Sequence, residues 1–150
     1  MKTFATLLAL GATPLAAQEV LPCDPLGSAQ AIAEPWEDHT RTFANGDVRV
    51  AVLDTIEPAL GSYYLLVLSP PYDELGGRQC RVIGFHGGMG FTTLDIGSMI
   101  ADYDPARGLV IQLLGRIADP EYDFTNTVNI WVTLNQSTGE ITTFSELGSE

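Results

Sequence analysis

The chain has 150 residues, 19 of them acidic and 7 basic, and its formal net charge at pH 7 is −12. Nucleic acid and anionic lipid surfaces carry charge of the same sign, so neither is a predicted partner. Hydrophobic residues make up 45% of the chain, which is enough to build one folded domain rather than a disordered tail.

The N-terminus, residues 1–17, is predicted to be an export signal. Lys2 supplies a positive charge, residues 4–12 are apolar, and small residues precede a predicted cleavage site after Ala17. An uncleaved N-terminal anchor is the alternative. No later run of about 18 uninterrupted apolar residues exists in the sequence, so no membrane insertion is expected after signal cleavage. The mature protein is therefore predicted to begin at Gln18 and to be periplasmic or secreted.

Two cysteines, Cys23 and Cys80, are present in the chain. An even count in an exported protein predicts one disulfide between them. The bond would tether an N-terminal segment, residues 18–38, to a single β domain over residues 39–150. The alternative, a catalytic thiol, needs a histidine partner, and the chain has only two histidines. We therefore expect the disulfide.

Eight short strands are predicted in chain order. Asn45-Gly46 favours a two-residue hairpin turn between the first two strands. Pro70-Pro71 is expected to end the third strand, because proline cannot donate to a sheet. The cleanest alternation of apolar and polar residues lies in the seventh strand, residues 127–135. The predicted strands cover residues 39–43, 47–54, 62–69, 79–85, 90–96, 108–117, 127–135 and 140–144.

Helix is expected to be scarce. Only residues 24–36 and 95–103 have room for a helical turn or two between the turn signals. Short strands at this spacing predict an all-β fold, either an antiparallel sandwich or a small closed barrel.

Residues 84–91, "GFHGGMGF", are the most unusual stretch of the sequence. The stretch resembles the histidine-glycine segment of esterases and lipases, which helps to form an oxyanion hole. That fold also needs a Gly-X-Ser-X-Gly elbow followed by a histidine, and no histidine follows Ser137, the nearest approach to such an elbow. A phosphate loop is disfavoured, because such loops usually contain a lysine and the only lysine of the sequence is Lys2. We expect a turn between strands, with Phe85 and Phe91 packed at its ends and His86 at its shoulder.

Three carboxylates, Asp119, Glu121 and Asp123, stand at alternate positions of the stretch "DPEYDFT". An extended chain would point them the same way, towards a calcium ion. Calcium takes about six to eight oxygen ligands, and three side chains are too few without help. We expect an acidic, hydrated loop, and no metal site is predicted.

The two histidines, His39 and His86, are the other candidates for chemistry. Either of them, paired with Asp54, Glu57 or Asp95, would provide acid–base groups. The spacing singles out no such pair, so each histidine is expected to be a turn or surface residue. No catalytic residue and no cofactor is assigned.

Trp131 is the one residue with a predicted ligand contact. It lies between Asn129 and Thr133, on the strand face opposite the valines and isoleucine. A tryptophan flanked by amide and hydroxyl groups on a sheet suits stacking against a sugar ring. Cover by another layer of the fold is the alternative.

Three functions stay open. The favoured one is an exported binding or interaction module, whose partner is an envelope or extracellular protein or a glycan. The second is a carbohydrate-binding module that uses Trp131. The third is a small hydrolase with a site near His86. Binding is preferred to catalysis, because no complete catalytic set can be assembled from the sequence.

Overall fold

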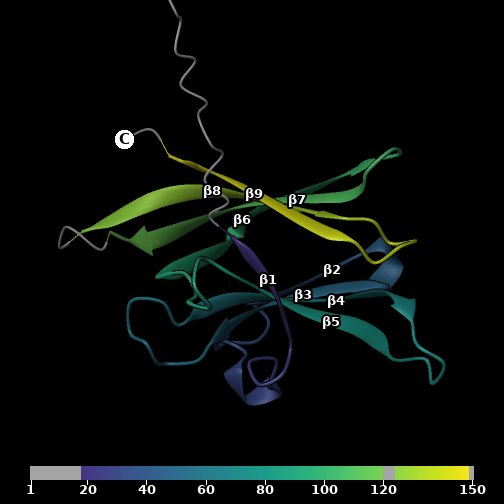
Figure 1. Ribbon diagram of the computed structural model, residues 1–150, viewed down its shortest axis with the longest axis horizontal. Helices are drawn as coiled ribbons and strands as arrows, with labels where there is room; N and C mark the ends of the chain where they lie inside the picture. The colour runs from purple at the N-terminus through teal and green to yellow at the C-terminus, as the bar shows by residue number, and fades with distance from the viewer. Residues whose placement is uncertain (1–17, 120–123, 149–150) are drawn as a thin grey trace, which may run out of the picture.

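The computed structural model describes residues 18–119 and 124–148. These residues form two antiparallel sheets that pack face to face, so the fold is an all-β sandwich (Figure 1). The all-β prediction is confirmed, and of its two architectures the sandwich is the one present. None of the helical segments in the described part is long and apolar enough to cross a membrane.

The five-stranded sheet has the order β1-β5-β4-β3-β2, and the four-stranded sheet has the order β6-β7-β8-β9. Strands β2 to β5 and β6 to β9 are thus two meanders of consecutive hairpins, and among the described strands only β1 stands out of chain order. The elements are β1 (Glu19–Pro22), η1 (Ala29–Ala31), β2 (Thr40–Phe43), η2 (Ala44–Gly46), β3 (Val48–Asp54), β4 (Tyr63–Tyr72), β5 (Arg78–Gly84), β6 (Thr93–Asp104), β7 (Gly108–Ala118), β8 (Thr125–Leu134) and β9 (Ile141–Leu147), where η denotes a 3-10 turn.

The core lies between the two sheets and follows the alternation of the strands. In β8, every second residue is buried, and in β3 three valines point to the same layer. Alternate residues of a strand point to opposite faces, so the predicted apolar face of β8 becomes the core face and Trp131 points outward. The residues concerned are Val128, Ile130, Val132 and Leu134 in β8 and Val48, Val50 and Val52 in β3.

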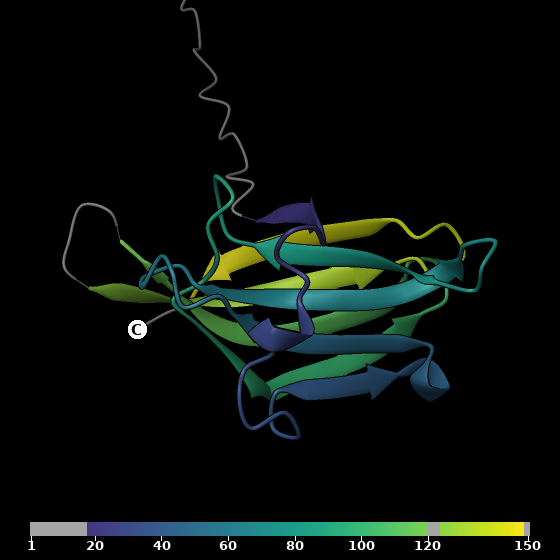
Figure 2. The ribbon, with the colours of Figure 1, turned by 90° about the horizontal axis from the view of Figure 1, so that it is seen from below.

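Part of the outer face of the five-stranded sheet is covered by the N-terminal segment. Tyr64, Leu66 and Val82 point away from the main core and are still buried, beneath residues 21–32. This segment runs from β1 across the sheet to η1, as Figure 2 shows. The cover explains why residues 62–69 are apolar on both faces of the strand.

A disulfide joins Cys23 to Cys80, as the sequence predicts, with 5.5 Å between the two Cα atoms. Cys23 directly follows β1, and Cys80 lies in β5, the strand with which β1 pairs. The bond therefore fixes the start of the covering segment to the sheet that it covers. Strand β1 also contacts β9 of the other sheet.

The first hairpin turns at Asn45-Gly46, as predicted, but its connection is longer than two residues. Phe43 pairs with Val48, so four residues, 44–47, connect β2 to β3 instead of two. Asn45 and Gly46 have positive φ angles of 56° and 91°, as their residue types favour. The connection is longer because Ala44 also has a positive φ angle, 51°, and so leaves the extended conformation of the strand. The N–H group of Asp47 still donates to the carbonyl of Ala44 at 3.1 Å, so Asn45 and Gly46 lie at the centre of the turn.

The expected end of the third strand is also wrong. Strand β4 continues through Pro70 and Pro71 to Tyr72. The pairing with β5 shifts its register between Ser69 and Tyr72, so the prolines lie in a β-bulge where no ladder hydrogen bond is required of them.

Residues 95–103 form part of β6 and not a helical turn. A register shift between Asp95 and Ile100 bends the strand, and the Asp95 carboxylate accepts hydrogen bonds from the N–H groups of Gly97 at 2.9 Å and Ser98 at 3.3 Å. The other candidate, residues 24–36, contains the short 3-10 turn η1.

Candidate functional site

The glycine stretch connects β5 in one sheet to β6 in the other, and it is a turn, as expected. Gly87 and Gly88 have φ angles of 62° and 77°, which other residues rarely adopt. Their N–H groups donate to the carboxylate of Glu19, at 3.1 and 2.9 Å. The amides that an anionic ligand would need are thus already occupied by a side chain of β1.

Contacts with Tyr63, Tyr64 and the packed rings of Phe85 and Phe91 hold the rest of this turn in place. The Tyr64 hydroxyl donates to the carbonyl of Gly88 at 3.0 Å, and burial raises the pKa of this phenol. A Cβ atom on Gly90 would collide with the carbonyl oxygen of Tyr63. The rings of Phe85 and Phe91 pack with their centroids 6.1 Å apart. The glycines are therefore explained by backbone geometry, without a ligand.

Neither histidine is brought to a carboxylate. His86 is exposed on the turn, and Nδ1 of His39 lies 3.0 Å from the carbonyl oxygen of Pro35. Within the described residues, no hydrogen bond or ion pair joins either imidazole to Asp54, to Asp95 or to any other carboxylate. His86 is thus a surface residue of its turn, as expected, and among the described residues no histidine–carboxylate pair is assembled for acid–base chemistry.

The acidic stretch lies partly within the described residues. Asp119 is hydrogen-bonded by the side chain of Asn126 at 3.3 Å, whereas Glu121 and Asp123 lie outside the described residues. In the part of the chain that the structure describes, no group of three or more His, Cys, Asp or Glu side chains could hold a metal ion.

Trp131 lies on the outer face of the four-stranded sheet and is half-buried. The strand register places it in one row with a residue from each of the other three strands: Ile100 in β6, Gln112 in β7 and Phe144 in β9. Ile100 is 63% exposed and Phe144 is 55% exposed. The Trp131 and Phe144 rings lie side by side, with centroids 5.4 Å apart and planes tilted by 41°.

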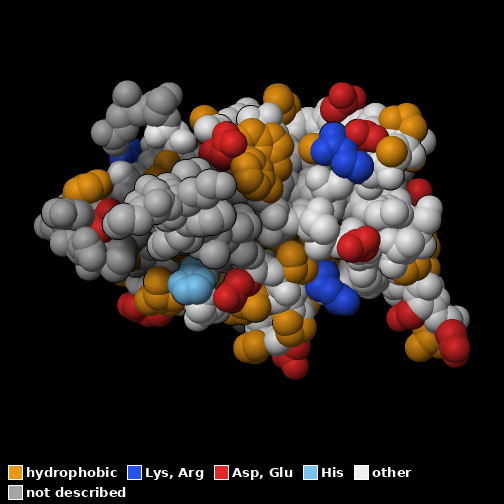
Figure 3. Space-filling view, turned by 45° about the horizontal axis from the view of Figure 1, so that its top comes forward, with side chains coloured by type: hydrophobic (Ala, Val, Ile, Leu, Met, Phe, Trp, Pro, Cys, Tyr) orange, Lys and Arg blue, Asp and Glu red, His pale blue; other side chains and the backbone are white. Residues whose placement is uncertain are grey.

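Beside this aromatic pair the surface is hollowed, with a volume of about 540 Å³. We call this site the outer hollow. The sheet forms its floor, and the turns at one end of the sheet form its walls. The floor residues are Val110, Trp131, Thr133, Thr142 and Phe144, and the wall residues are Arg107, Asn135 and Glu140. Figure 3 looks onto this side of the molecule, where hydrophobic side chains lie beside acidic and basic ones.

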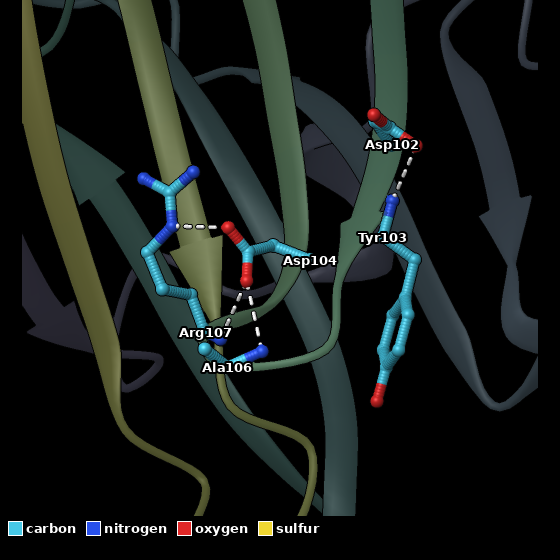
Figure 4. Close-up of polar contacts among 5 residues, drawn as sticks. All are labelled: Asp102, Tyr103, Asp104, Ala106 and Arg107. Atoms are coloured by element: carbon cyan, nitrogen blue, oxygen red, sulfur yellow. Dashed lines mark hydrogen bonds and ion pairs between the residues drawn. The ribbon is translucent and has the colours of Figure 1, made fainter.

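One wall is the β6–β7 turn, which Asp104 holds in shape (Figure 4). One carboxylate oxygen accepts the N–H groups of Ala106 at 2.8 Å and Arg107 at 3.2 Å, and the other accepts Nε of Arg107 at 2.8 Å. The hydrogen bond from the Arg107 side chain, helped by the two backbone amides, lowers the pKa of Asp104. With Nε so fixed, the two terminal nitrogens of Arg107 point away from Asp104.

The other wall is the β8–β9 turn. The side-chain oxygen of Asn135 accepts the N–H groups of Ser137 at 3.0 Å and Thr138 at 3.2 Å. Both bonds use the oxygen, so the amide nitrogen of Asn135 stays available to a ligand. Glu140 closes this turn and is exposed at the rim of the outer hollow.

A second hollow, of about 380 Å³, lies on the five-stranded sheet near β2 and β3. It is lined by aliphatic residues, two threonines, Gly46, Arg41 and Arg49, and no aromatic side chain is among its lining residues. The outer hollow is thus the larger of the two and the one that contains the predicted contact residue, Trp131.

The sequence pattern points to Trp131 but not to the residues around it. Phe144, Arg107 and Glu140 are not singled out, because each lies in an ordinary strand or turn pattern. Their proximity depends on strand register. Comparison of the chain with protein-family models, with curated proteins and with solved structures finds no match in any of the three.

Proposed function

We propose that the protein is an exported binding domain that binds its ligand on the outer face of the four-stranded sheet. The observation that carries this proposal is the contrast between the two outer faces. Residues 21–32 cover the five-stranded sheet around Tyr64 and Val82, and the hollow left on that sheet is lined by no aromatic side chain, whereas Ile100 and Phe144 on the four-stranded sheet are more than half exposed. Figure 1 shows no described segment across that second face. Exposed apolar groups gathered at one place, next to polar groups, are typical of binding sites.

Binding is supported over catalysis by the groups that line the outer hollow. They are aromatic rings, hydroxyls, an amide and two charged side chains, and neither a histidine nor a cysteine is among them. A nucleophile needs an adjacent base, and general acid–base chemistry needs a paired titratable group. The outer hollow instead offers flat apolar surface and hydrogen-bonding groups, which hold a ligand without changing it.

Export to the periplasm or the outside of the cell is supported by the disulfide between Cys23 and Cys80. Such bonds persist in oxidising compartments and are rare in the cytosol. The expected measurement is an intact mass that corresponds to a chain beginning at Gln18. Secreted material that retains residues 1–17 would contradict the cleaved export signal.

The binding proposal is tested with three immobilised proteins: wild type, Phe144→Ala and Trp36→Ala. Trp36 is a matched control, because it is 54% exposed but lies in the turn before β2. Extract of the cell envelope and culture medium is passed over each protein, and retained proteins and sugars are quantified. We expect material that wild type and Trp36→Ala retain and that Phe144→Ala loses. If nothing retained depends on Phe144, the outer face is not a binding surface.

A further inference from the structure

The aromatic pair gives the outer hollow a fixed apolar surface. Trp131 and Phe144 are direct neighbours across β8 and β9, so backbone hydrogen bonds set the position of both rings. The half-buried indole has limited freedom, and the exposed Phe144 ring extends its surface. A flat ligand with an apolar face would stack here without any rearrangement of the sheet.

Polar groups surround this surface, and within residues 18–119 and 124–148 they have no hydrogen-bond partner. The indole N–H of Trp131, the hydroxyls of Thr133 and Thr142 and the amide nitrogen of Asn135 make no hydrogen bond with another described residue. Donors and acceptors that converge on one hollow, without partners of their own, are what fixes the orientation of a bound ligand.

The two charged side chains of the outer hollow have opposite signs. The guanidinium of Arg107 on one wall is paired with Asp104, and the carboxylate of Glu140 lies on the other wall. An anionic ligand would meet Glu140 and a protein of net charge −12, and a cationic ligand would meet Arg107. A hydroxyl group both donates and accepts, so a ligand rich in hydroxyls satisfies both walls at once.

We infer that the ligand of the outer hollow is a neutral saccharide; this inference rests on the proposed binding function. The C–H face of a sugar ring stacks on Trp131 and Phe144. Its hydroxyls accept from Arg107 and Asn135 and donate to Glu140. The volume of about 540 Å³ lies within the range of about 300–1,000 Å³ that is usual for small-ligand sites.

The test uses the full protein and a panel of purified neutral oligosaccharides: β-1,3- and β-1,4-linked glucose oligomers, α-1,4-linked glucose oligomers and β-1,4-linked N-acetylglucosamine oligomers. An oligogalacturonate serves as the acidic comparison. The chain has two tryptophans, so two indole N–H signals are expected in an NMR spectrum of ¹⁵N-labelled protein. Assignment comes from Trp131→Phe and Trp36→Phe.

We expect at least one neutral oligosaccharide to shift the Trp131 indole signal and to leave that of Trp36 unchanged. By calorimetry, Trp131→Ala and Phe144→Ala should each weaken this binding about tenfold or more, whereas Trp36→Ala should not change it. The wild-type indole signal keeps the test valid even if Trp131→Ala folds poorly.

Three outcomes would overturn the inference. The whole panel could leave the Trp131 signal unmoved, the oligogalacturonate alone could move it, or binding could survive Phe144→Ala. If Phe144-dependent retention of a protein is still seen in the extract experiment, the proposed function stands and only the saccharide is refuted. If neither experiment depends on Phe144, both fail.

Discussion

Glu19 is predicted to act as a latch that holds the first residue of β1 to the glycine turn. Its two carboxylate oxygens accept one N–H group each, from Gly87 at 3.1 Å and from Gly88 at 2.9 Å. A hydrogen bond to a charged group contributes about 1.5–3 kcal/mol when it is buried. Here both glycines are exposed and Glu19 is half-buried, so water replaces part of what is lost. We therefore expect Glu19→Ala to lower the free energy of unfolding by about 1–3 kcal/mol.

Two comparisons isolate the contribution of the latch. Glu19→Gln keeps the length of the side chain but presents an amide nitrogen to one of the two N–H groups, so it should lose about half of the stabilisation. Glu74→Gln, in the exposed β4–β5 turn, removes the same charge without touching the latch. Urea unfolding gives the free energies, and hydrogen exchange should show faster exchange at Val20 in β1. The reasoning is refuted if Glu19→Ala and Glu74→Gln both lie within about 0.5 kcal/mol of wild type.

The other predictions concern the disulfide, the glycine turn and the acidic residue of the β6–β7 turn. Replacing Cys23 and Cys80 together with serine should cost about 2–4 kcal/mol in urea unfolding, because the bond spans a sequence separation of 57; an unchanged midpoint would contradict this. Gly88→Val should cost about 1–3 kcal/mol through its φ of 77° alone, since no atom of the described residues other than its two chain neighbours lies within 4 Å of the added Cβ. His86→Ala should stay within about 0.5 kcal/mol of wild type, and a screen of ester, glycoside and peptide substrates should find no turnover that the substitution removes. The pKa of Asp104 in the folded protein is lowered from 3.8. The contribution of this carboxylate to stability is therefore fully present above pH 3.8 and is lost as the pH falls through the lower pKa of the folded state. An NMR titration of Asp104 with a midpoint at or above 3.8 would contradict this.

The sequence predicts the strands well where one face is buried. In β8 the alternation of Val128 to Leu134 is by itself enough to place Trp131 on the outer face. The prediction does not reach Phe144, because its pairing with Trp131 depends on the register of β9. A shift of one residue would turn Phe144 to the other face of its strand, and the turn signals alone do not specify that register.

Contacts between residues far apart in the chain are the other feature that the sequence alone does not predict. Glu19 reads as an unremarkable acidic residue next to a predicted cleavage site, and its partners are far away in the chain. Nothing local marks it as the anion bound by the glycine turn. Pro70 and Pro71 mislead for a related reason: a bulge permits prolines in β4, and a bulge is a property of strand pairing.

The position of β1 bears on how the chain assembles during synthesis. Ribosomes make β1 before every other strand, yet its partner is β5, which emerges only after β2, β3 and β4. The two meanders form from neighbouring hairpins that close short loops, whereas β1 closes a long one and loses more chain entropy. A chain in which the bond between Cys23 and Cys80 has not yet formed has no covalent anchor for its covering segment. Such a chain leaves the apolar outer face around Leu53 and Leu66 open to chaperones and to aggregation.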